Sequence, residues 1–246
     1  MIANTCKAAI LVGLPPAIAA CSNVQAQDRS GYATSVHDSR YEQVTGSGNL
    51  VQERRTFGDF DQIRTDSSLD IVVRQGPRSD IIVEADDNPI DMVELRMEDR
   101  DTLLVTTTGS FRSRNPMTVY VTVPALDGAS VRGSGDIHFP DWSARSLALA
   151  VSGSGDIRVA GNVERVDAAV AGSGDIDLRE ARVREANASV AGSGDIRMAS
   201  VETVNAAVMG SGDIRVGDVD RIVGNVAGSG DIHYASARSA TGTFGD

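Results

Sequence analysis

The pentapeptide Gly-Ser-Gly-Asp-Ile decides the fold of this chain, because it occurs six times at nearly even spacing. The copies begin at Gly133, Gly153, Gly172, Gly192, Gly210 and Gly228. Successive copies are 20, 19, 20, 18 and 18 residues apart, and a valine stands two residues before each first glycine. A corner that recurs at about this spacing is typical of a solenoid, in which each repeat forms one coil.

The residues on both sides of each copy alternate between apolar and polar. With the isoleucine of the motif taken as inward, Ile157 and Val159 face inward after one copy, and Val166, Ala168 and Val170 face inward before the next. Period-two alternation rich in valine and isoleucine indicates β-strands. Equivalent residues of parallel strands stack about 4.8 Å apart, so we expect an all-β parallel solenoid with apolar rows inside and coils of 18–20 residues.

The two glycines of each motif predict a corner that only glycine tolerates. Such a corner needs either a positive φ angle or a very close approach to the neighbouring coil. The serine between the glycines could bond corner amides or the next serine.

The aspartates of the motif are the most obvious candidates for chemistry, because outward aspartates would form a column with one coil between neighbours. They are Asp136, Asp156, Asp175, Asp195, Asp213 and Asp231. A catalytic site is needed once, whereas this residue recurs six times, so we expect the column to be structural and each carboxylate to accept hydrogen bonds from corner amides. Three arginines stand two residues after a motif aspartate and are expected beside the column: Arg158, Arg197 and Arg215.

Calcium and catalysis are the two alternatives for this column. Calcium prefers six to eight oxygen ligands, more than one aspartate per coil readily supplies. The column spacing also resembles the carboxylate pairs of retaining glycosidases, which leaves a carbohydrate-active enzyme open. We expect no cofactor and no bound metal.

The N-terminus predicts export. Residues 1–20 carry one lysine followed by an apolar run, which is typical of a signal peptide. Ile-Ala-Ala-Cys at residues 18–21 resembles a lipoprotein signal, in which Cys21 is lipidated. The alternative is ordinary cleavage after Ala26, which would give a soluble periplasmic or secreted protein.

The rest of the chain divides by composition. Residues 21–44 are polar and are expected to form a tether. Residues 45–125 predict irregular β coils, residues 126–236 the regular repeats, and residues 237–246 a tail. Ser-Ser-Leu-Asp-Ile at residues 67–71 and Gly-Ser-Gly-Asn-Leu at residues 46–50 are two degenerate copies of the motif, so we expect the irregular part to continue the solenoid.

Two groups of side chains are candidates for binding. Phe139 and Trp142 form the only local aromatic cluster, where Trp142 could stack on a sugar or else pack over the coil edge. Arg112 and Arg114 lie in the expected exposed loop 109–116 and could meet an anionic surface. The net charge of −11 and the lack of a basic stripe argue against nucleic acid as a partner.

The combination of motifs resembles the bacterial family called putative auto-transporter adhesin, head GIN domain. The residues that carry the resemblance are the six Gly-Ser-Gly-Asp-Ile copies, the Phe-Asp-Gln-Ile run at 60–63 and the Val-Tyr-Val-Thr-Val-Pro run at 119–124, within a span of about 45–236. The resemblance implies an exported, right-handed β-helix-like fold. Because the residues after Tyr234 form a short polar stretch, we expect an envelope-associated head-like domain rather than an autotransporter.

We therefore expect a non-enzymatic β-solenoid that presents a repetitive surface for adhesion or binding to an envelope glycan or protein. The lipid on Cys21 would hold it at the outer membrane, on the periplasmic or the surface side. The alternatives are a polyuronate lyase or glycosidase, and a calcium-stabilised scaffold. An uncapped terminal coil could also pair end to end with another chain.

Overall fold

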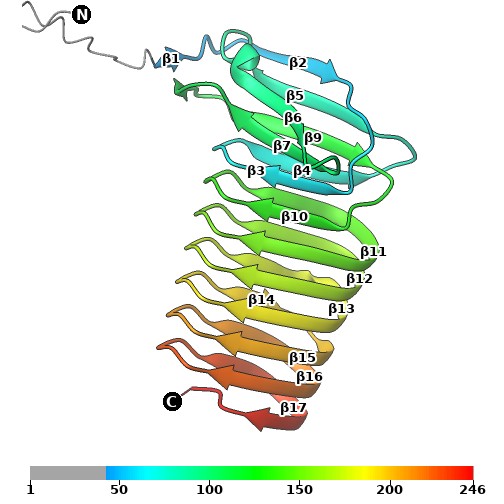
Figure 1. Cartoon of the computed structure of the whole chain (residues 1–246), viewed down its shortest axis with the longest axis vertical. Helices are drawn as coiled ribbons and strands as arrows, with labels where there is room; N and C mark the ends of the chain where they lie inside the picture. The colour runs from blue at the N-terminus through cyan, green and yellow to red at the C-terminus, as the bar shows by residue number, and fades with distance from the viewer. Residues whose placement is uncertain (1–42, 246) are drawn as a thin grey trace, which may run out of the picture. The chain divides into compact units, whose positions relative to one another are not determined.

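The computed structural model describes residues 43–245, which form a β-solenoid (Figure 1). Its regular part is built from β10 (Gly128–Val131), β11 (Ile137–Val151), β12 (Ile157–Val170), β13 (Ile176–Val190), β14 (Ile196–Met198), β15 (Val201–Val208), β16 (Ile214–Val226) and β17 (Ile232–Gly242). Within the described residues, no helix is long and apolar enough to cross a membrane.

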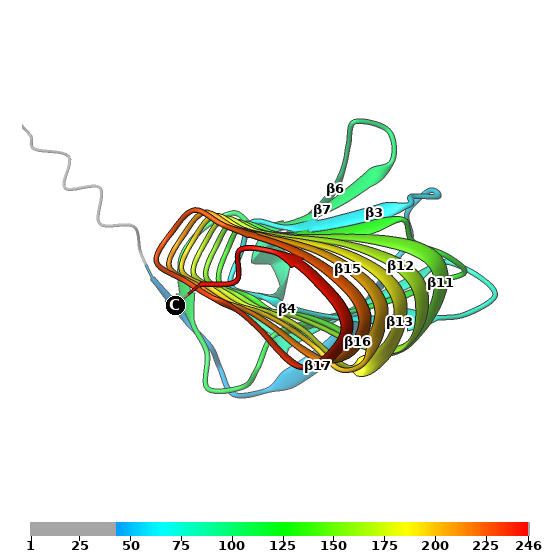
Figure 2. The same ribbon diagram turned by 90° about the horizontal axis from the view of Figure 1, so that it is seen from below.

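Each regular coil is one motif corner followed by one long bent strand. Viewed from the end of the stack, the coils are narrow loops, closed on one side by the corner and on the other by the bend (Figure 2). Neighbouring coils pair in parallel with the motifs in register, as in the pairing of Ile157 with Ile137 and with Ile176. The parallel solenoid predicted from the repeat is therefore confirmed.

The inside of the stack is filled by the apolar rows that the alternation predicts. At most 1% of the surface is exposed in inward residues such as Ile137, Ile157 and Ile176 of successive motifs, and Val131 and Val151 before the corners. Burying a large aliphatic side chain contributes roughly 1.5–3 kcal/mol, so these rows are the main source of stability. All described strands and the whole core lie within one compact unit, so residues 43–246 are expected to fold by themselves.

The motif glycines are required by close approach and not by backbone conformation. None of the twelve has a positive φ angle. A Cβ atom on Gly174 would lie 2.1 Å from the carbonyl oxygen of Gly155, its counterpart in the preceding coil. Real Cβ atoms essentially never come this near to backbone, so neighbouring corners can stack only when these two positions lack a side chain.

The first repeat is the degenerate one around residues 67–71. It joins β3 (Gln62–Thr65) to β4 (Asp70–Gln75), which pair with β10 and β11 respectively. Val131 is in register with Thr65 and Ile137 with Ile71, as the alignment of the degenerate copy predicts.

The next coil outward comes later in the sequence. It is formed by β7 (Thr102–Thr107) and β9 (Thr118–Val123), which pair in parallel with β3 and β4. The chain thus leaves the stack after β4, builds an outer coil, and returns beneath the first one at β10. The order of coils in space therefore differs from their order in the sequence at this end.

Antiparallel strands close the N-terminal end. They are β2 (Leu50–Arg55), β5 (Asp80–Asp86) and β6 (Val93–Glu98), with the short helix η1 (Ile90–Met92) between β5 and β6. β5 pairs with β9 and β2, and β6 pairs with β7, all antiparallel. The interpretation of residues 46–50 as a second degenerate repeat is wrong, because Leu50 begins the antiparallel strand β2.

The C-terminal residues are also part of the fold. β17 continues to Gly242 and pairs with β16 over that whole length, so the predicted tail 237–246 is wrong for residues 237–242. Thr243 and Phe244 then cross the open end of the last coil (Figure 2). The predicted signal peptide, Cys21, the alternative cleavage at Ala26 and nearly all of the tether lie outside the described residues.

Candidate functional site

The motif aspartates form a hydrogen-bonded ladder along the solenoid. The Oδ1 atom of each accepts the backbone N–H of the aspartate in the following coil, at 2.8 Å from Asp156 to Asp136 and at 2.7 Å from Asp195 to Asp175. Asp70 of the degenerate repeat begins the ladder by accepting from Asp136. Each carboxylate therefore fastens the next corner to its own.

Arginines bridge neighbouring rungs of the ladder, as their position in the repeat predicts. Arg197 contacts Asp175 at 2.6 Å and Asp195 at 2.7 Å, and Arg215 contacts Asp195 and Asp213. Burial acts to raise the pKa of Asp195, but the N–H of Asp213 and the two arginines outweigh it, so this pKa lies below its ordinary value. The bridges offset the repulsion between stacked carboxylates.

A metal is poorly supported along this ladder. Within residues 43–245 there is one group of three acidic or histidine side chains close enough to share an ion, namely Asp213, Asp231 and His233. Their ligand atoms lie within 4.8 Å of one another at the last two corners. The sequence argument compared only histidines with one another and missed this group. Two half-buried aspartates and one exposed histidine fall short of the six to eight oxygens that calcium takes.

Trp142 is a core residue, so of its two alternatives the sugar-stacking platform is wrong and packing is correct, although Trp142 packs inside the coil as part of β11 and not in a loop over the edge. Its side chain is 0% exposed, as is that of Phe139, and the two rings meet edge to face at 5.3 Å between centroids. Both face inward because the register shifts between them, at Pro140 and Asp141.

Arg112 and Arg114 are exposed on either side of an inward-facing serine. Arg112 belongs to the short strand β8 (Phe111–Arg112), which pairs with β1 (Val44–Thr45). Ser113 between them donates to the buried carboxylate of Asp86 at 2.6 Å, and Asn115 donates to the other oxygen at 2.6 Å. These two bonds hold the pKa of Asp86 below its usual range. The loop is anchored, and binding by its arginines stays a prediction.

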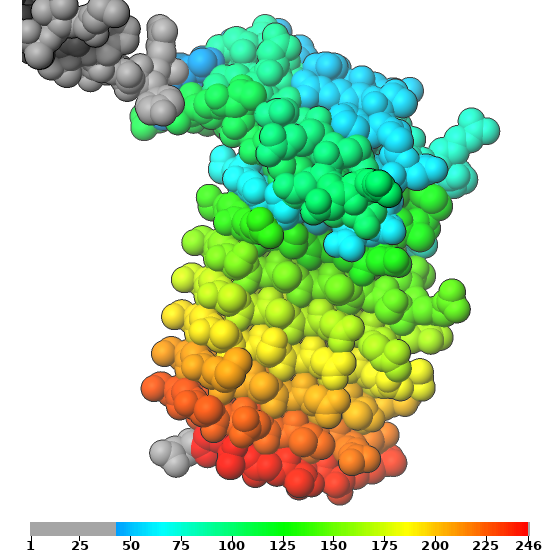
Figure 3. Space-filling view, viewed as in Figure 1, coloured from blue at the N-terminus to red at the C-terminus, as the bar shows by residue number. Residues whose placement is uncertain are grey.

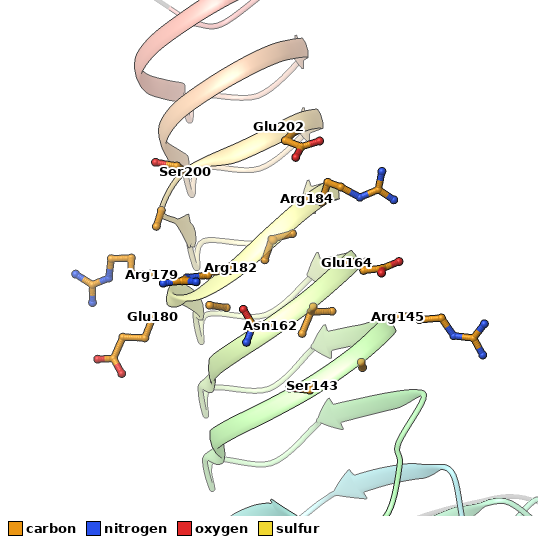
Figure 4. A pocket seen from close by; sticks show the side chains of 15 residues that line it. Ser143, Arg145, Asn162, Glu164, Arg179, Glu180, Arg182, Arg184, Ser200 and Glu202 are labelled. Carbon is orange, nitrogen blue, oxygen red and sulfur yellow. The ribbon is translucent and has the colours of Figure 1, made fainter.

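A large hollow of the surface lies on the bend of the long strands. It has a volume of about 950 Å³ and is lined by residues 143–145, 162–164, 179–184, 199, 200 and 202, from β11 to β15 (Figure 4). Smaller hollows adjoin it on both sides and share residues with it. The one toward β10 measures about 460 Å³ and shares Arg145 and Glu164, and the one toward β17 measures about 630 Å³ and shares Glu202. Together they form an axial groove, which we call the bend groove.

A column of charged side chains follows the bend groove, one from each coil. The register of the strands shows that these side chains stand at equivalent positions of successive coils. For example, Ala144 pairs with Val163 and Ser146 with Arg165, so Arg145 lies opposite Glu164. Its members are Arg145, Glu164, Arg184, Glu202, Asp220 and Arg238. Figure 4 shows the first four along one edge of the hollow, with Arg179 and Glu180 on the opposite side. Sequence reasoning missed this column because it counted from the motif, and the coils differ in length between the motif and the bend.

Two ion pairs flank the bend groove. Arg165 contacts Glu185 at 2.6 Å and lowers the pKa of that carboxyl group, and Arg179 likewise lowers the pKa of Asp177. Arg145 and Arg182 are exposed, and neither forms an ion pair with any other residue of the described part. The groove thus presents fixed charges of both signs, with two arginines available to a ligand.

Solved structures of similar fold are known, whereas no curated protein matches the chain. A protein described as a putative adhesin from Bacteroides fragilis superposes with a TM-score of 0.64, at 23% identity, over 78% of this chain and 99% of that one. A putative adhesin from Parabacteroides merdae gives a TM-score of 0.56 at 22% identity, over 78% and 98%. A third, from Parabacteroides distasonis, gives 0.52 at 19% identity, over 82% and 100%. At these identities the likeness shows a common fold.

The family is shown by a separate comparison. The model of the family described as putative auto-transporter adhesin, head GIN domain, matches residues 59–237. This span runs from just before β3 to the middle of β17, well over half of the chain. The resemblance seen in the repeats is confirmed: the chain belongs to the auto-transporter adhesin head GIN domain family.

Proposed function

We propose that this protein is a non-enzymatic binding protein of the cell envelope, which holds an envelope glycan or protein in the bend groove. The observation that carries the proposal is the charged column, which repeats once per coil along a continuous hollow. Evenly spaced charges suit a partner that is itself extended and repetitive, because each coil offers the next contact at about 4.8 Å. The family and the fold agree with a role in adhesion.

The state of the carboxylates favours binding over glycoside hydrolysis. A glycosidase needs one carboxyl group whose pKa is raised, so that it can donate a proton to the leaving group. Asp177 and Glu185 pair with the groove-lining arginines Arg179 and Arg165, and in both cases the arginine lowers the pKa of the carboxyl group. They are suited to electrostatic contact and unsuited to general acid catalysis.

The N-terminal sequence supports attachment of the protein to the outer membrane. A lipid on Cys21 would be followed by about twenty polar residues and then by the first strand, which begins at Val44. Such a spacer lets the head reach away from the membrane surface. Metabolic labelling with a fatty-acid analogue tests the anchor: the wild-type chain is labelled and the Cys21→Ser variant is not. Equal absence of label in both would favour cleavage after Ala26.

The binding role is tested by incubating residues 43–246 with envelope fractions and with a glycan array. The variant Arg145→Glu/Arg184→Glu reverses two charges of the groove column. Its matched control, Arg78→Glu/Arg132→Glu, makes the same change in net charge at exposed positions outside the groove. We expect the groove variant to lose binding at least tenfold and the control to bind as wild type does.

The same experiment separates the two partner classes. Retention on the glycan array, or on envelopes treated with protease, identifies a glycan, and loss after protease treatment identifies a protein. Binding that both double variants retain equally, or no binding to either material, would overturn the proposal.

A further inference from the structure

The last coil of the solenoid has an unpaired edge. Within the part of the chain that the structure describes, β17 pairs only with β16, whereas every inner coil pairs on both sides. β17 is eleven residues long and contains no proline. A long free strand edge of this kind is a template for pairing with another strand.

The free edge carries backbone donors that point away from the molecule. The N–H of Ala227 donates to Val208 in the preceding coil. Backbone N–H groups point alternately to the two neighbouring strands, so the N–H of Ile222, five residues earlier, points to β17 in the following coil. Ala240 is the register partner of Ile222 in β17. Its N–H therefore points forward as well, to the side where no further coil follows.

The C-terminal segment covers only one corner of this end. The carbonyl oxygen of Phe244 accepts the N–H of Ile232, which in inner coils goes to the aspartate of the following motif. The Phe244 ring packs on Tyr234 at 5.3 Å between centroids. These contacts imitate the next motif corner and leave the strand from Ala235 to Ala240 without a partner beyond it.

The charge of this end permits two copies to meet. The whole chain has a net charge of −11, yet residues 232–245 contain no aspartate or glutamate. Charged side chains are a usual protection of exposed edges, and in β17 the ionisable side chains besides Tyr234 are His233 and Arg238. No acidic side chain of β17 itself therefore repels a second copy at this edge.

The opposite end is a poorer match for β17, because its free strand edges belong to the antiparallel strands β2 and β6 and not to a regular coil. There the outermost coil is bordered by the antiparallel strands β5 and β6, and β2 pairs in turn with β5 (Figure 1). A head-to-tail contact would have to join this irregular cap to the regular edge of β17. Two β17 edges are identical, however, and can pair antiparallel about a twofold axis, which makes a closed contact.

We propose that two copies of this protein associate tail to tail through the free edge of β17, forming a dimer that cannot grow further. A strand of this length offers about 36 Å of edge at 3.3 Å per residue. A contact confined to one strand edge is small, so we expect a dimer that dissociates on dilution. The proposal is independent of the bend groove, which lies on the side of the stack.

Sedimentation of residues 43–246 over a concentration series tests the dimer. We expect a monomer–dimer equilibrium for the wild type. Ala240→Pro removes an edge-facing N–H, and Ala240→Lys places an inward charge at the open end; both should stay monomeric at all concentrations. Ala150→Lys, the same exchange at an exposed position in the middle of the stack, should dimerise like the wild type.

Circular dichroism and the melting temperature show whether each variant is folded. If the Ala240→Pro variant fails to fold, the oligomeric state of the Ala240→Lys variant decides the test. A wild type that is monomeric up to several hundred micromolar, Ala240 variants that dimerise as the wild type does, or oligomers that grow beyond two copies would each overturn the proposal.

Discussion

At the scale of single residues, the motif glycines have a sharply defined role. A Cβ atom on Gly174 would meet the carbonyl oxygen of Gly155 at 2.1 Å, and the obstacle is backbone that cannot rotate away. Gly174→Ala is therefore expected to destabilise the fold by about 1–3 kcal/mol or more, the range for overpacking in well-packed sites. Chemical denaturation of residues 43–246 measures the loss.

Ser173 provides the control for that substitution. It lies beside Gly174 in the same corner, but its side chain is exposed and makes no hydrogen bond to any described residue. Ser173→Ala should change the free energy of unfolding by less than about 0.5 kcal/mol. An equal loss from both variants would contradict the close-approach explanation.

Asp86 is expected to give the protein part of its acid sensitivity. Ser113 and Asn115 hold its folded-state pKa below the unfolded value of about 3.9. A lowered folded pKa contributes stability above the unfolded pKa, and this stability is lost as the pH falls through the folded pKa. The melting temperature of Asp86→Asn should thus lie below that of the wild type at pH 7, and the difference should shrink below about pH 4. A difference that is constant with pH would exclude this linkage.

Substitutions of Trp142 test whether this residue acts in the core or in binding. Truncating a fully buried large aromatic costs about 3–5 kcal/mol, so Trp142→Ala should lower stability strongly, and Trp142→Phe less. Thermal melting measures both, and the folded fraction of the phenylalanine variant should bind envelope material normally. Weakened binding at unchanged stability would restore the platform interpretation.

At the scale of elements, the aspartate ladder fastens coil to coil through one backbone bond at each corner. Asp175→Asn keeps the acceptor for the N–H of Asp195 and loses only the charge beside Arg197, so its cost should be below about 1 kcal/mol. Asp175→Ala also leaves that N–H without its acceptor, which adds about 1 kcal/mol or more. Equal denaturation midpoints for the two variants would mean that the ladder does not stabilise the corners.

The sequence was sufficient for the regular elements because one short motif fixes the register of every coil. The inward rows, the ladder and its arginines all follow from counting outward from Gly-Ser-Gly-Asp-Ile, and even the degenerate copy at residues 67–71 is placed correctly. Each of these features is local to a corner, where the glycines allow one arrangement only.

The features that the sequence did not predict depend on contacts between segments that are distant in the sequence. Nothing in residues 102–123 indicates that they stack outside residues 62–75, since both read as alternating strands. The inward turn of Trp142 depends on a register shift at Pro140. The column from Arg145 to Arg238 emerges only when coils of unequal length are aligned at their bend.

At the scale of the whole molecule, the different sides of the solenoid carry different structural features. The corner side is occupied by the hydrogen-bonded ladder and the bend by the charged groove. Antiparallel strands close the N-terminal end, above the stacked coils in the view of Figure 3. The groups of the ladder satisfy one another, whereas Arg145 and Arg182 of the groove contact solvent. The bend groove is therefore the side on which a partner can form the most new ionic contacts.

Protection of arginines from chemical modification tests this account most directly. Residues 43–246 are treated with an arginine-specific reagent, free and bound to envelope material, and mass spectrometry reads each arginine in the same sample. The account predicts that Arg145, Arg182 and Arg184 become protected on binding, while Arg78 and Arg132 react as they do in the free protein. Protection of Arg78 and Arg132 with unchanged reaction in the groove would contradict it.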